Sequence, residues 1–510
     1  MRKRVRKKRP RPSPDGPATT SSPAIDRHRA YQAALAAAEA TLKTQPDHPL
    51  ALFERAALLA ALGFDEAAQD AYVATLRRDP THFGALTNLG GLALKHGHRA
   101  AALTAYREAA DRHPERAPAQ VNLANLLLED EIFDEAERCY RQALRLEPDC
   151  AEAHQGLAML MIAQGRDAEA ESHWRRGFEG RAILTKPFRG EGEPLRILLL
   201  VSARGGNIPT GQILDDRLFE VSALYAEFES CAPVLPAHDL VFNAVGDADL
   251  CGEALAGAER VLTRTQAPLI NRPRAVSATT RKANATRMAG IQGAIAPRIA
   301  RLPRLALIRD DASRALAAEG LGFPILLRSP GFHTGRHFVR VETRDELRAA
   351  LGALPGEELL AIEPLTGVSR DGLARKYRVM VIDGRLYPLH MAAACDWKVH
   401  YFSSAMADRP DLRAEEARFL SDMPGVLGAA ATSALAAIGD QMGLDYAGVD
   451  FGLSEHGELL FFEANAAMAI VRPEADPMWD YRRAAIDRAL QAARQLLFSR
   501  AALRPSALSA

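Results

Sequence analysis

The stretch FGALTNLGGLALKHGHRAAALTAYREAADRHP, residues 83–114, contains two helical patterns in succession. In each half, apolar residues recur every three or four positions, the spacing that places them on one face of an α-helix. Gly97 interrupts the pattern between the halves, and the second half stops at Pro114, which cannot continue a helix. The stretch therefore predicts a pair of helices joined by a tight turn.

The same pattern returns at a fixed interval of 34 residues. A proline, a large aromatic residue and a small alanine each recur at this interval: Pro46, Pro80, Pro114 and Pro148; Tyr72, Tyr106, Tyr140 and Trp174; and Ala34, Ala68, Ala102, Ala136 and Ala170. A period of this length predicts a stack of similar helix pairs. Residues 28–180 resemble tetratricopeptide repeats, which implies an all-α array whose concave groove binds a protein or peptide partner.

Length and composition limit the remaining possibilities. A chain of 510 residues is expected to form two or three domains. The sequence has no run of about 18 apolar residues, so no membrane partner is expected. The five cysteines are scattered without a CxxC pair, which argues against a disulfide framework and a zinc site. Prolines follow the basic N-terminus where a secretory signal needs an apolar core, so a cytoplasmic location is expected.

The formal charge of zero hides a basic N-terminus. Residues 1–11, MRKRVRKKRPR, hold eight Lys or Arg residues and no acid. Such a segment favours a disordered, solubilising tail, with contact to nucleic acid as the alternative. Apart from this tail, nucleic acid is not an expected partner.

Beyond the repeats the sequence predicts an α/β organisation. Short aliphatic runs such as LRILLLVSA, residues 195–203, are typical of buried parallel strands, and helical stretches separate them. No GxGxxG motif accompanies Gly205-Gly206, so a nicotinamide site is not predicted. The predicted fold class is multidomain: an all-α repeat array, then a small open-sheet α/β domain, then an α+β domain. The expected boundaries are a basic tail at 1–27, repeats at 28–182, a linker at 183–194, the small domain at 195–275, the α+β domain at 276–500 and a tail at 501–510.

The segment LDYAGVDFGLSEHGELLFFEANA, residues 444–466, predicts a hairpin that turns at His456-Gly457. Pairing about this turn makes Asp450 and Glu463 cross-strand neighbours, and Asn465 lies on the same face two residues later. Two adjacent carboxylates repel one another unless a cation neutralises them. Oxygen ligands suit Mg²⁺, with Mn²⁺ as an alternative, and Mg²⁺ usually retains phosphate and water as further ligands. The structural alternative is an edge hairpin with a solvated polar face.

Several other residues stand at places where a phosphate could be bound. Lys282 follows two threonines that can cap a helix, and Gly331 and Gly335 give a loop the freedom to lay backbone N–H groups over an anion. Considered singly, each has an ordinary structural explanation. The remaining candidates close or flank predicted strands: Arg328, Glu363, Arg378 and Lys398.

Together these segments resemble the ATP-grasp superfamily over residues 195–500, especially the branch of glutathione synthetase and the ribosomal-protein glutamate ligases. The resemblance rests on NRPRAVSATTRKANATRMAGI, FPILLRSPGFHTGRHF, AIEPL and AGVDFGL…LLFFEANA, in this order. It implies that ATP and a small-molecule or peptide carboxylate are substrates, and that an acyl phosphate reacts with an amine or thiol. The implied roles are ATP binding by Lys282, Arg328, Gly331, Gly335, Glu363 and Leu365, catalysis by Arg378 and Lys398, and metal binding by Asp450, Glu463 and Asn465.

Two residues depart from the pattern of that superfamily. Arg328 stands where lysine is usual, and Arg281 stands where an acid is common. Arginine binds phosphate with a different geometry from lysine. Two alternatives therefore stay open: an interaction scaffold whose ATP-grasp part binds nucleotide or nothing, and a phosphotransferase on the same fold.

Overall fold

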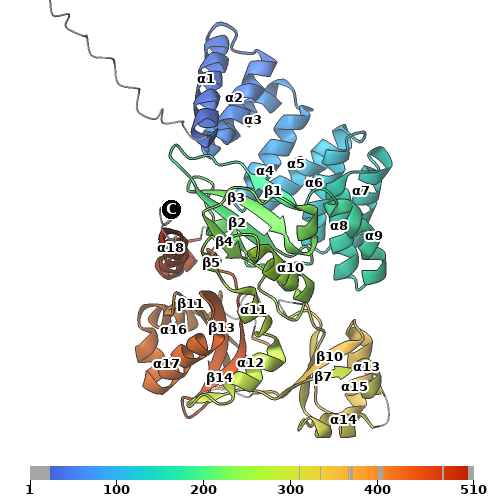
Figure 1. Ribbon diagram of the computed structural model, residues 1–510, viewed down its shortest axis with the longest axis vertical. Helices are drawn as coiled ribbons and strands as arrows, with labels where there is room; N and C mark the ends of the chain where they lie inside the picture. The colour runs from blue at the N-terminus through green and yellow to red at the C-terminus, as the bar shows by residue number, and fades with distance from the viewer. Residues whose placement is uncertain are drawn as a thin grey trace, which may run out of the picture.

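The computed structural model describes residues 23–308, 311–332, 335–365, 367, 371–399, 406–473 and 476–503. Most of the two predicted tails lies outside these residues. Within the described ranges, no helix is both long and apolar enough to cross a membrane. In the view of Figure 1, the N-terminal helices form an array at the top of the molecule. The last helices of the array lie beside the first of three β-sheets, and the other two sheets lie below.

The array consists of antiparallel helices with the predicted 34-residue spacing. The recurring Ala68, Ala102 and Ala136 are fully buried where paired helices approach one another, and Tyr72 and Tyr140 fill the adjoining space. The first helix begins at Pro23, a residue type favoured at a helix start, five residues before the expected boundary of the repeats. The helices are α1 (Pro23–Thr44), α2 (Pro49–Ala61), α3 (Asp65–Arg78), α4 (Phe83–Lys95), α5 (Arg99–Arg112), α6 (Ala117–Glu129), α7 (Phe133–Leu146), α8 (Ala151–Ala163) and α9 (Asp167–Phe178).

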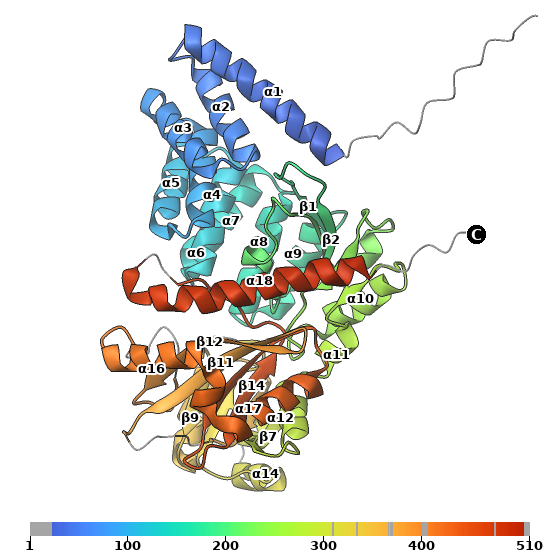
Figure 2. The same cartoon turned by 90° about the vertical axis from the view of Figure 1, so that its left-hand side faces the viewer.

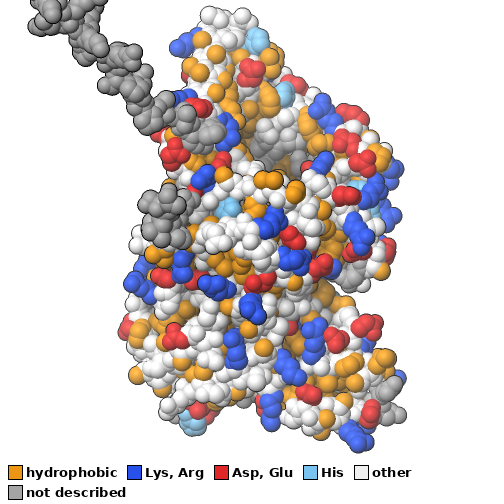
Figure 3. Space-filling model, viewed as in Figure 1, with side chains coloured by type: hydrophobic (Ala, Val, Ile, Leu, Met, Phe, Trp, Pro, Cys, Tyr) orange, Lys and Arg blue, Asp and Glu red, His pale blue; other side chains and the backbone are white. Residues whose placement is uncertain are grey.

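Acidic and basic side chains are interspersed over the outer helices of the array (Figure 3). Several of them form ion pairs between successive repeats. Arg99 Nε lies 2.6 Å from Asp130 Oδ1, and Arg107 Nη2 lies 3.2 Å from Glu135 Oε2. Since these pairs are exposed, each adds only about 0–1 kcal/mol, and the buried alanines and tyrosines provide most of the stability.

The first sheet follows the array directly. Its strand order is β1-β3-β2-β4-β5, with β1 antiparallel and the other strands parallel. Residues 183–186, which the sequence predicted to be part of a linker, pair with β3 and form the edge strand of this sheet. The strands are β1 (Ile183–Lys186), β2 (Leu195–Val201), β3 (Phe219–Tyr225), β4 (Leu240–Asn243) and β5 (Leu269–Ile270), and the helices of this part are α10 (Gly252–Leu262) and α11 (Pro273–Ser277).

The second sheet is a small antiparallel sheet with the strand order β7-β10-β8-β9. Helices α13 and α15 cover it in Figure 1. Its elements are β7 (Ile299–Pro303), α13 (Arg304–Ile308), α14 (Ala312–Ala318), β8 (Ile325–Arg328), β9 (Phe338–Val341), α15 (Arg344–Ala353) and β10 (Glu358–Ile362).

The third sheet has the order β12-β11-β13-β14-β6 and contains two hairpins. Ile382 pairs with Arg385 across the turn at Asp383-Gly384, where both turn residues have positive φ (50° and 70°), as the sequence pattern predicted. The strands are β6 (Ala294–Ile295), β11 (Ala374–Ile382), β12 (Arg385–Ala394), β13 (Tyr446–Leu453) and β14 (Leu459–Asn465), and the helices are α12 (Arg281–Met288), α16 (Pro410–Ser421), α17 (Met423–Met442) and α18 (Asp480–Ala502).

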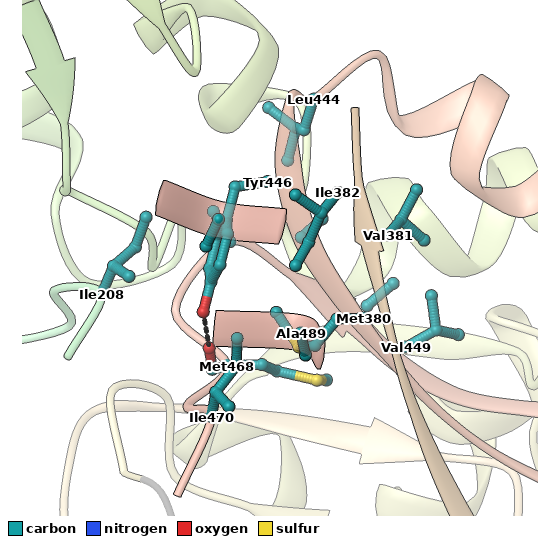
Figure 4. Packing of buried hydrophobic residues seen from close by; sticks show 14 of the residues in the cluster. Ile208, Met380, Val381, Ile382, Leu444, Tyr446, Val449, Met468, Ile470 and Ala489 are labelled. Carbon is teal, nitrogen blue, oxygen red and sulfur yellow. Dashed lines mark hydrogen bonds between the residues drawn. The ribbon is translucent and has the colours of Figure 1, made fainter. Parts of the chain in front are cut away.

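One continuous core joins the first and third sheets. Tyr446 lies between Ile208 of the first sheet's domain and Ile382 of β11, and its hydroxyl donates to the Met468 carbonyl at 3.1 Å (Figure 4). The long helix α18 crosses the molecule beneath the array (Figure 2), and its Phe498 contacts Phe219 of β3 with ring centroids 5.2 Å apart. Helix α18 therefore packs on both the first and the third sheet.

The array is joined to the first sheet by aromatic packing. Phe178, the last residue of α9, is buried against Tyr225 and Phe228, with ring centroids 4.4 and 4.8 Å away. A second joint lies near the other end of the array, where Arg189 Nη1 is 3.2 Å from Asp65 Oδ1. The array is thus joined to the first sheet and its flanking segments near both of its ends.

Candidate functional site

A cavity of about 920 Å³ lies between the second and third sheets. Its walls come from β8, β9 and β10 on one side and from β11, β12, β13 and β14 on the other. Among the described residues that line it, eight are Arg or Lys and five are Asp or Glu. Arg375 and Arg482 are paired with the acids Glu415 and Glu416, which lie outside the lining. The other cations of the lining can attract anionic ligands. The charged lining residues are Arg281, Arg328, Arg340, Arg375, Lys376, Arg378, Lys398 and Arg482, together with Glu342, Glu363, Asp396, Asp450 and Glu463.

The hairpin of β13 and β14 forms one wall of the cavity. Asp450 and Glu463 are direct cross-strand partners, as the sequence predicted, and Asn465 pairs with Gly448. The Asn465 amide nitrogen donates to Glu463 Oε1 at 2.7 Å. The Asn465 Oδ1 atom is buried and accepts no hydrogen bond from the described residues, so this oxygen keeps its capacity to bind a donor or a cation.

Asp450 is neutralised by two cations of the neighbouring strand β11. Arg378 is its register partner, and the Nε and Nη2 atoms of Arg378 donate to the two carboxylate oxygens at 2.6 and 2.8 Å. Lys376 Nζ lies 3.1 Å from Asp450 Oδ2. Burial alone would raise the pKa of Asp450, but the charges of Arg378 and Lys376 hold it well below its ordinary value. Asp450 is therefore ionised at neutral pH.

Arg281, rather than Lys282, faces the cavity at the start of α12. Arg281 forms an ion pair with Glu463 and is one of the lining residues. Lys282 does not line the cavity, and its Nζ lies 3.3 Å from Glu319 Oε2 on the exposed side of the helix. Successive residues of a helix point about 100° apart, so only one of the two can face inward. Thr280 accepts a hydrogen bond from the Ala283 N–H and caps this helix, as expected from the sequence.

Arg328 projects into the cavity from the end of β8. It is buried and donates to the Phe332 carbonyl. Burial and the charge of Arg281 lower the pKa of Arg328 to about 10, which still leaves the side chain charged at neutral pH. Gly335 lines the cavity, whereas Gly331 lies against Leu250 of the first sheet's domain.

The remaining predicted residues line the cavity as well. Lys398 Nζ donates to the Phe338 carbonyl at 3.4 Å. Glu363 follows β10, and its Oε1 lies 2.8 Å from Arg298 Nη2, which lowers the pKa of the carboxyl. Leu365 lies two residues further along the same wall. Lys398, Glu363 and Leu365 thus join Arg328, Arg378 and the hairpin residues in one cavity, and Lys282 and Gly331 do not.

Sequence reasoning missed several lining residues. Lys376 lies two residues before Arg378 on β11, so strand alternation places both on one face and could have identified it. His390 is the register partner of Arg378 on β12, and burial together with the Arg378 charge lowers its pKa well below the ordinary value. Arg482 pairs with the buried Glu416 of α16, with 2.6 Å between Nη2 and Oε2. No local pattern connects Arg482 with the cavity, because it reaches the wall from α18.

The described residues contain no group of three or more His, Cys, Asp or Glu side chains placed to hold a metal ion. The predicted metal ligands Asp450, Glu463 and Asn465 are not such a group, because they are two carboxylates and one amide. Its oxygens lie on one face of the hairpin, and the buried Asn465 Oδ1 is still available as an acceptor. These hard oxygen donors fit Mg²⁺.

Comparison with known proteins identifies the array. A family model described as tetratricopeptide repeat matches residues 64–114, 87–137 and 121–176. A crystal structure of MamA shares 20% identity over 30% of this chain and 92% of that chain, with a TM-score of 0.28. MamA from Desulfovibrio magneticus RS-1 shares 21% sequence identity over 31% of this chain and 95% of that chain, with a TM-score of 0.27.

A further solved structure is TTC0263, a thermophilic tetratricopeptide repeat protein of Thermus thermophilus. It shares 27% identity over 31% of this chain and 87% of that chain, with a TM-score of 0.26. A search of curated proteins found no match. Residues 64–176 of this chain are tetratricopeptide repeats, and the family match and the 34-residue period agree on this.

Proposed function

We propose that the sheet-containing part of this protein is an ATP- and Mg²⁺-dependent ligase, and that the repeat array recruits a protein or peptide. The ligase would activate a carboxylate as an acyl phosphate and join it to an amine or thiol. The observation that carries the proposal is the cavity that eight cationic side chains line together with the Asp450–Glu463 pair, three of them in ion pairs with these two carboxylates. The resemblance of residues 195–500 to the ATP-grasp superfamily supports it.

The cavity lining combines apolar and charged side chains. Ile362, Leu365 and Phe338 provide apolar surface and Glu363 provides a carboxylate, a combination that suits a nucleobase and ribose. Cationic side chains lie beside the hairpin carboxylates and over the Phe338 ring. A nucleoside triphosphate needs both environments, because its base is apolar and its phosphates are anionic.

In the proposed reaction, the protein positions charge rather than supplying a covalent nucleophile. Arg281 and Arg328 would bind phosphate oxygens. Arg378, which donates two hydrogen bonds to Asp450 in the structure, would direct its charge toward the reacting carboxylate together with Lys398 once Mg²⁺ replaces it at Asp450. These contacts would align the attacking oxygen with the γ-phosphate.

Asp450, Glu463 and Asn465 would hold Mg²⁺. When bound, the ion would neutralise phosphate charge during transfer. In the structure, Asp450 and Glu463 are already paired with cations. Metal binding would therefore require Arg281 to turn from Glu463 toward the phosphates, and Arg378 and Lys376 to turn from Asp450 toward the reacting carboxylate. Each cation would then exchange a carboxylate partner of the protein for an anionic group of a substrate.

The test is an ADP-release assay with ATP, Mg²⁺ and panels of acids and amines, combined with thermal shift. ATP at about 100 times its Kd should add about 2.7 kcal/mol to the free energy of unfolding. Glu463→Gln should reduce ADP release at least about tenfold, because it removes a metal and arginine partner. Arg348→Ala, on the exposed face of α15, is the matched control and should leave both readouts unchanged.

Lys282→Ala tests whether Lys282 binds ATP, as the superfamily resemblance implies, or lies outside the site, as the structure has it. Because Lys282 lies outside the cavity, the variant should retain ATP affinity, whereas Arg328→Ala should lose it. An absence of ADP with every substrate pair, together with no effect of Glu463→Gln on ATP binding, would reject the ligase proposal.

One observation favours a second candidate, an interaction protein whose cavity binds an anion without turnover. The pairs Arg281–Glu463 and Arg378–Asp450 neutralise both hairpin carboxylates without a metal. This candidate predicts nucleotide binding that EDTA does not weaken and no ADP. The ligase proposal predicts that EDTA weakens nucleotide binding.

A further inference from the structure

Each tetratricopeptide repeat contains a tight turn between its two helices, and one residue of this turn has a left-handed backbone. The residues are 34 positions apart: Gly63, Gly97, Glu131 and Gly165, with φ of 81°, 80°, 60° and 75°. Glycine adopts this conformation without strain, whereas a residue with a Cβ does not. Three turns therefore have the expected glycine, and the third repeat has a strained glutamate in its place.

The side chain of Glu131 reaches the cavity-bearing part of the molecule. Its Oε1 atom lies 2.8 Å from Arg336 Nη1. The equivalent turn of the second repeat is open, since a Cβ added to Gly97 would meet no atom of the described chain within 4 Å. The unfavourable backbone of Glu131 thus coincides with a contact that glycine could not make, and strain of this kind often accompanies function.

Arg336 belongs to a segment that forms part of the cavity. The preceding residue, Gly335, lines the cavity beside Lys398, and the backbone carbonyl of Phe338 accepts from Lys398 Nζ at 3.4 Å. Arg336 itself does not line the cavity. Its ion pair therefore connects the repeat array to the segment without contacting the space where a ligand would be bound.

The next turn of the array approaches the same region. A Cβ added to Gly165 would lie 3.8 Å from Pro355 Cβ. The Pro355 carbonyl accepts a hydrogen bond from Ser329 Oγ at 2.6 Å, and Ser329 directly follows Arg328. The turn of the third repeat thus contacts the segment that begins at Gly335, and the turn of the fourth lies near Pro355, whose hydrogen-bond partner Ser329 adjoins the cavity residue Arg328.

We propose that the repeat array regulates the cavity through the Glu131–Arg336 ion pair. The turn of the third repeat holds residues 335–338 against the cavity, so a protein or peptide that displaces this turn changes the affinity for nucleotide. By thermodynamic linkage, nucleotide changes the affinity for that partner by the same factor. The regulatory part rests on the proposed nucleotide binding, whereas the ion pair's hold on residues 335–338 does not.

The expected size of the effect is modest. The Glu131 and Arg336 side chains are 50% and 31% exposed, and ion pairs of this kind correspond to roughly a 1.5- to 5-fold change in an equilibrium constant. Salt screens such pairs. The coupling should therefore be present at low ionic strength and largely lost in about 0.5 M salt.

The experiment compares Glu131→Gln and Glu131→Gly with Gly97→Glu. The first two variants remove the ion pair, and Glu131→Gly also removes the backbone strain. Gly97→Glu is the control because it introduces the same strain in another turn of the array, where an added Cβ meets no atom of the described chain within 4 Å. The readouts are hydrogen exchange of amides 335–341 without ligand, the Kd for ATP with Mg²⁺, and the Tm.

Both Glu131 variants should speed exchange of amides 335–341 and weaken ATP binding about two- to fivefold at low salt. Glu131→Gly should also raise the Tm relative to Glu131→Gln. Gly97→Glu should lower the Tm and leave exchange and ATP affinity unchanged. The charge reversal Glu131→Arg with Arg336→Glu should restore slow exchange.

Unchanged exchange at 335–341 in both Glu131 variants would overturn the inference, whatever ATP does. Faster exchange with an unchanged Kd for ATP would overturn its regulatory part. A full-length wild-type protein that binds no ATP would overturn the proposed function, and the exchange comparison would still decide whether the ion pair holds the segment.

Discussion

Asp450 is a buried carboxylate that depends on the cations of a neighbouring strand. Its side chain is 5% exposed, and Arg378 and Lys376 provide its compensating charge. Removing one partner of a buried ion pair is costly, because the remaining charge stays buried and Asp450 would keep only Lys376 as a compensating cation. We expect Arg378→Met to lower the free energy of unfolding by about 3 kcal/mol, measured by urea denaturation.

A double-mutant cycle separates this interaction from the general effect of substitution. Arg378→Met combined with Asp450→Asn should cost at least about 1 kcal/mol less than the sum of the two single losses. Additive losses would show that the two side chains do not stabilise one another.

His154 and His173 form a second residue-scale feature that responds to pH. Their Nδ1 atoms are 2.7 Å apart, and His154 Nε2 lies 3.0 Å from the Pro148 carbonyl oxygen. Burial lowers the pKa of both imidazoles in the folded array. The unfolded chain, with an ordinary pKa of about 6.5, therefore binds protons more readily than the folded one.

The sign of the pH effect follows from this difference. The two neutral histidines make their full contribution to the free energy of unfolding above about pH 6.5. This contribution is lost progressively as the pH falls below that value. We expect the pH dependence between about 7 and 5.5 to be shallower in His154→Gln than in the wild type, as measured by thermal unfolding of the full chain. Parallel pH profiles would exclude this pair as the cause.

At the scale of elements, helix α4 contains two adjacent glycines with opposite roles. A Cβ added to buried Gly90 would lie 2.6 Å from Tyr106 Cε1 of α5, whereas one added to exposed Gly91 would lie 3.7 Å from the Tyr106 hydroxyl. We expect Gly90→Ala to lower the free energy of unfolding by about 1–3 kcal/mol through overpacking. Gly91→Ala should raise it by about 0.5–1 kcal/mol, since alanine is the better helix former.

Thermal and urea unfolding of the two variants provide the comparison, each serving as the control for the other. The same sign for both changes would mean that the aromatic residue does not restrict the distance between α4 and α5.

At the scale of the whole molecule, Phe178 is the main apolar joint between the array and the first sheet. It is almost fully buried against Tyr225 and Phe228. Truncating a buried phenylalanine to alanine typically costs about 3–5 kcal/mol. We expect Phe178→Ala to separate the unfolding of the array from that of the sheets, visible as a second transition in calorimetry.

Phe64→Ala is the control for this experiment, because that side chain is 50% exposed at a turn of the array. It should change the free energy of unfolding by no more than about 0.5 kcal/mol. A single unshifted transition in Phe178→Ala would show that other contacts join the two parts.

The sequence alone determined the features that depend on short-range physics. The 34-residue period predicted the repeats, because each helix pair packs mainly on its neighbours in the chain. The pairing of Asp450 with Glu463 was predicted from the position of the nearby turn, and the structure reaches this pairing through a one-residue register shift between Asp450 and Phe451. The ATP-grasp resemblance and the activity it implies stay a prediction.

Only the tertiary structure decided which charged side chains meet. Arg281 rather than Lys282 faces Glu463, Lys376 and Arg378 neutralise Asp450, and Glu131 reaches Arg336. The partners in these pairs are separated by 72 to 205 residues. Helical and strand periodicity assign a side chain to a face of its own element, but the packing of distant elements decides what that face contacts.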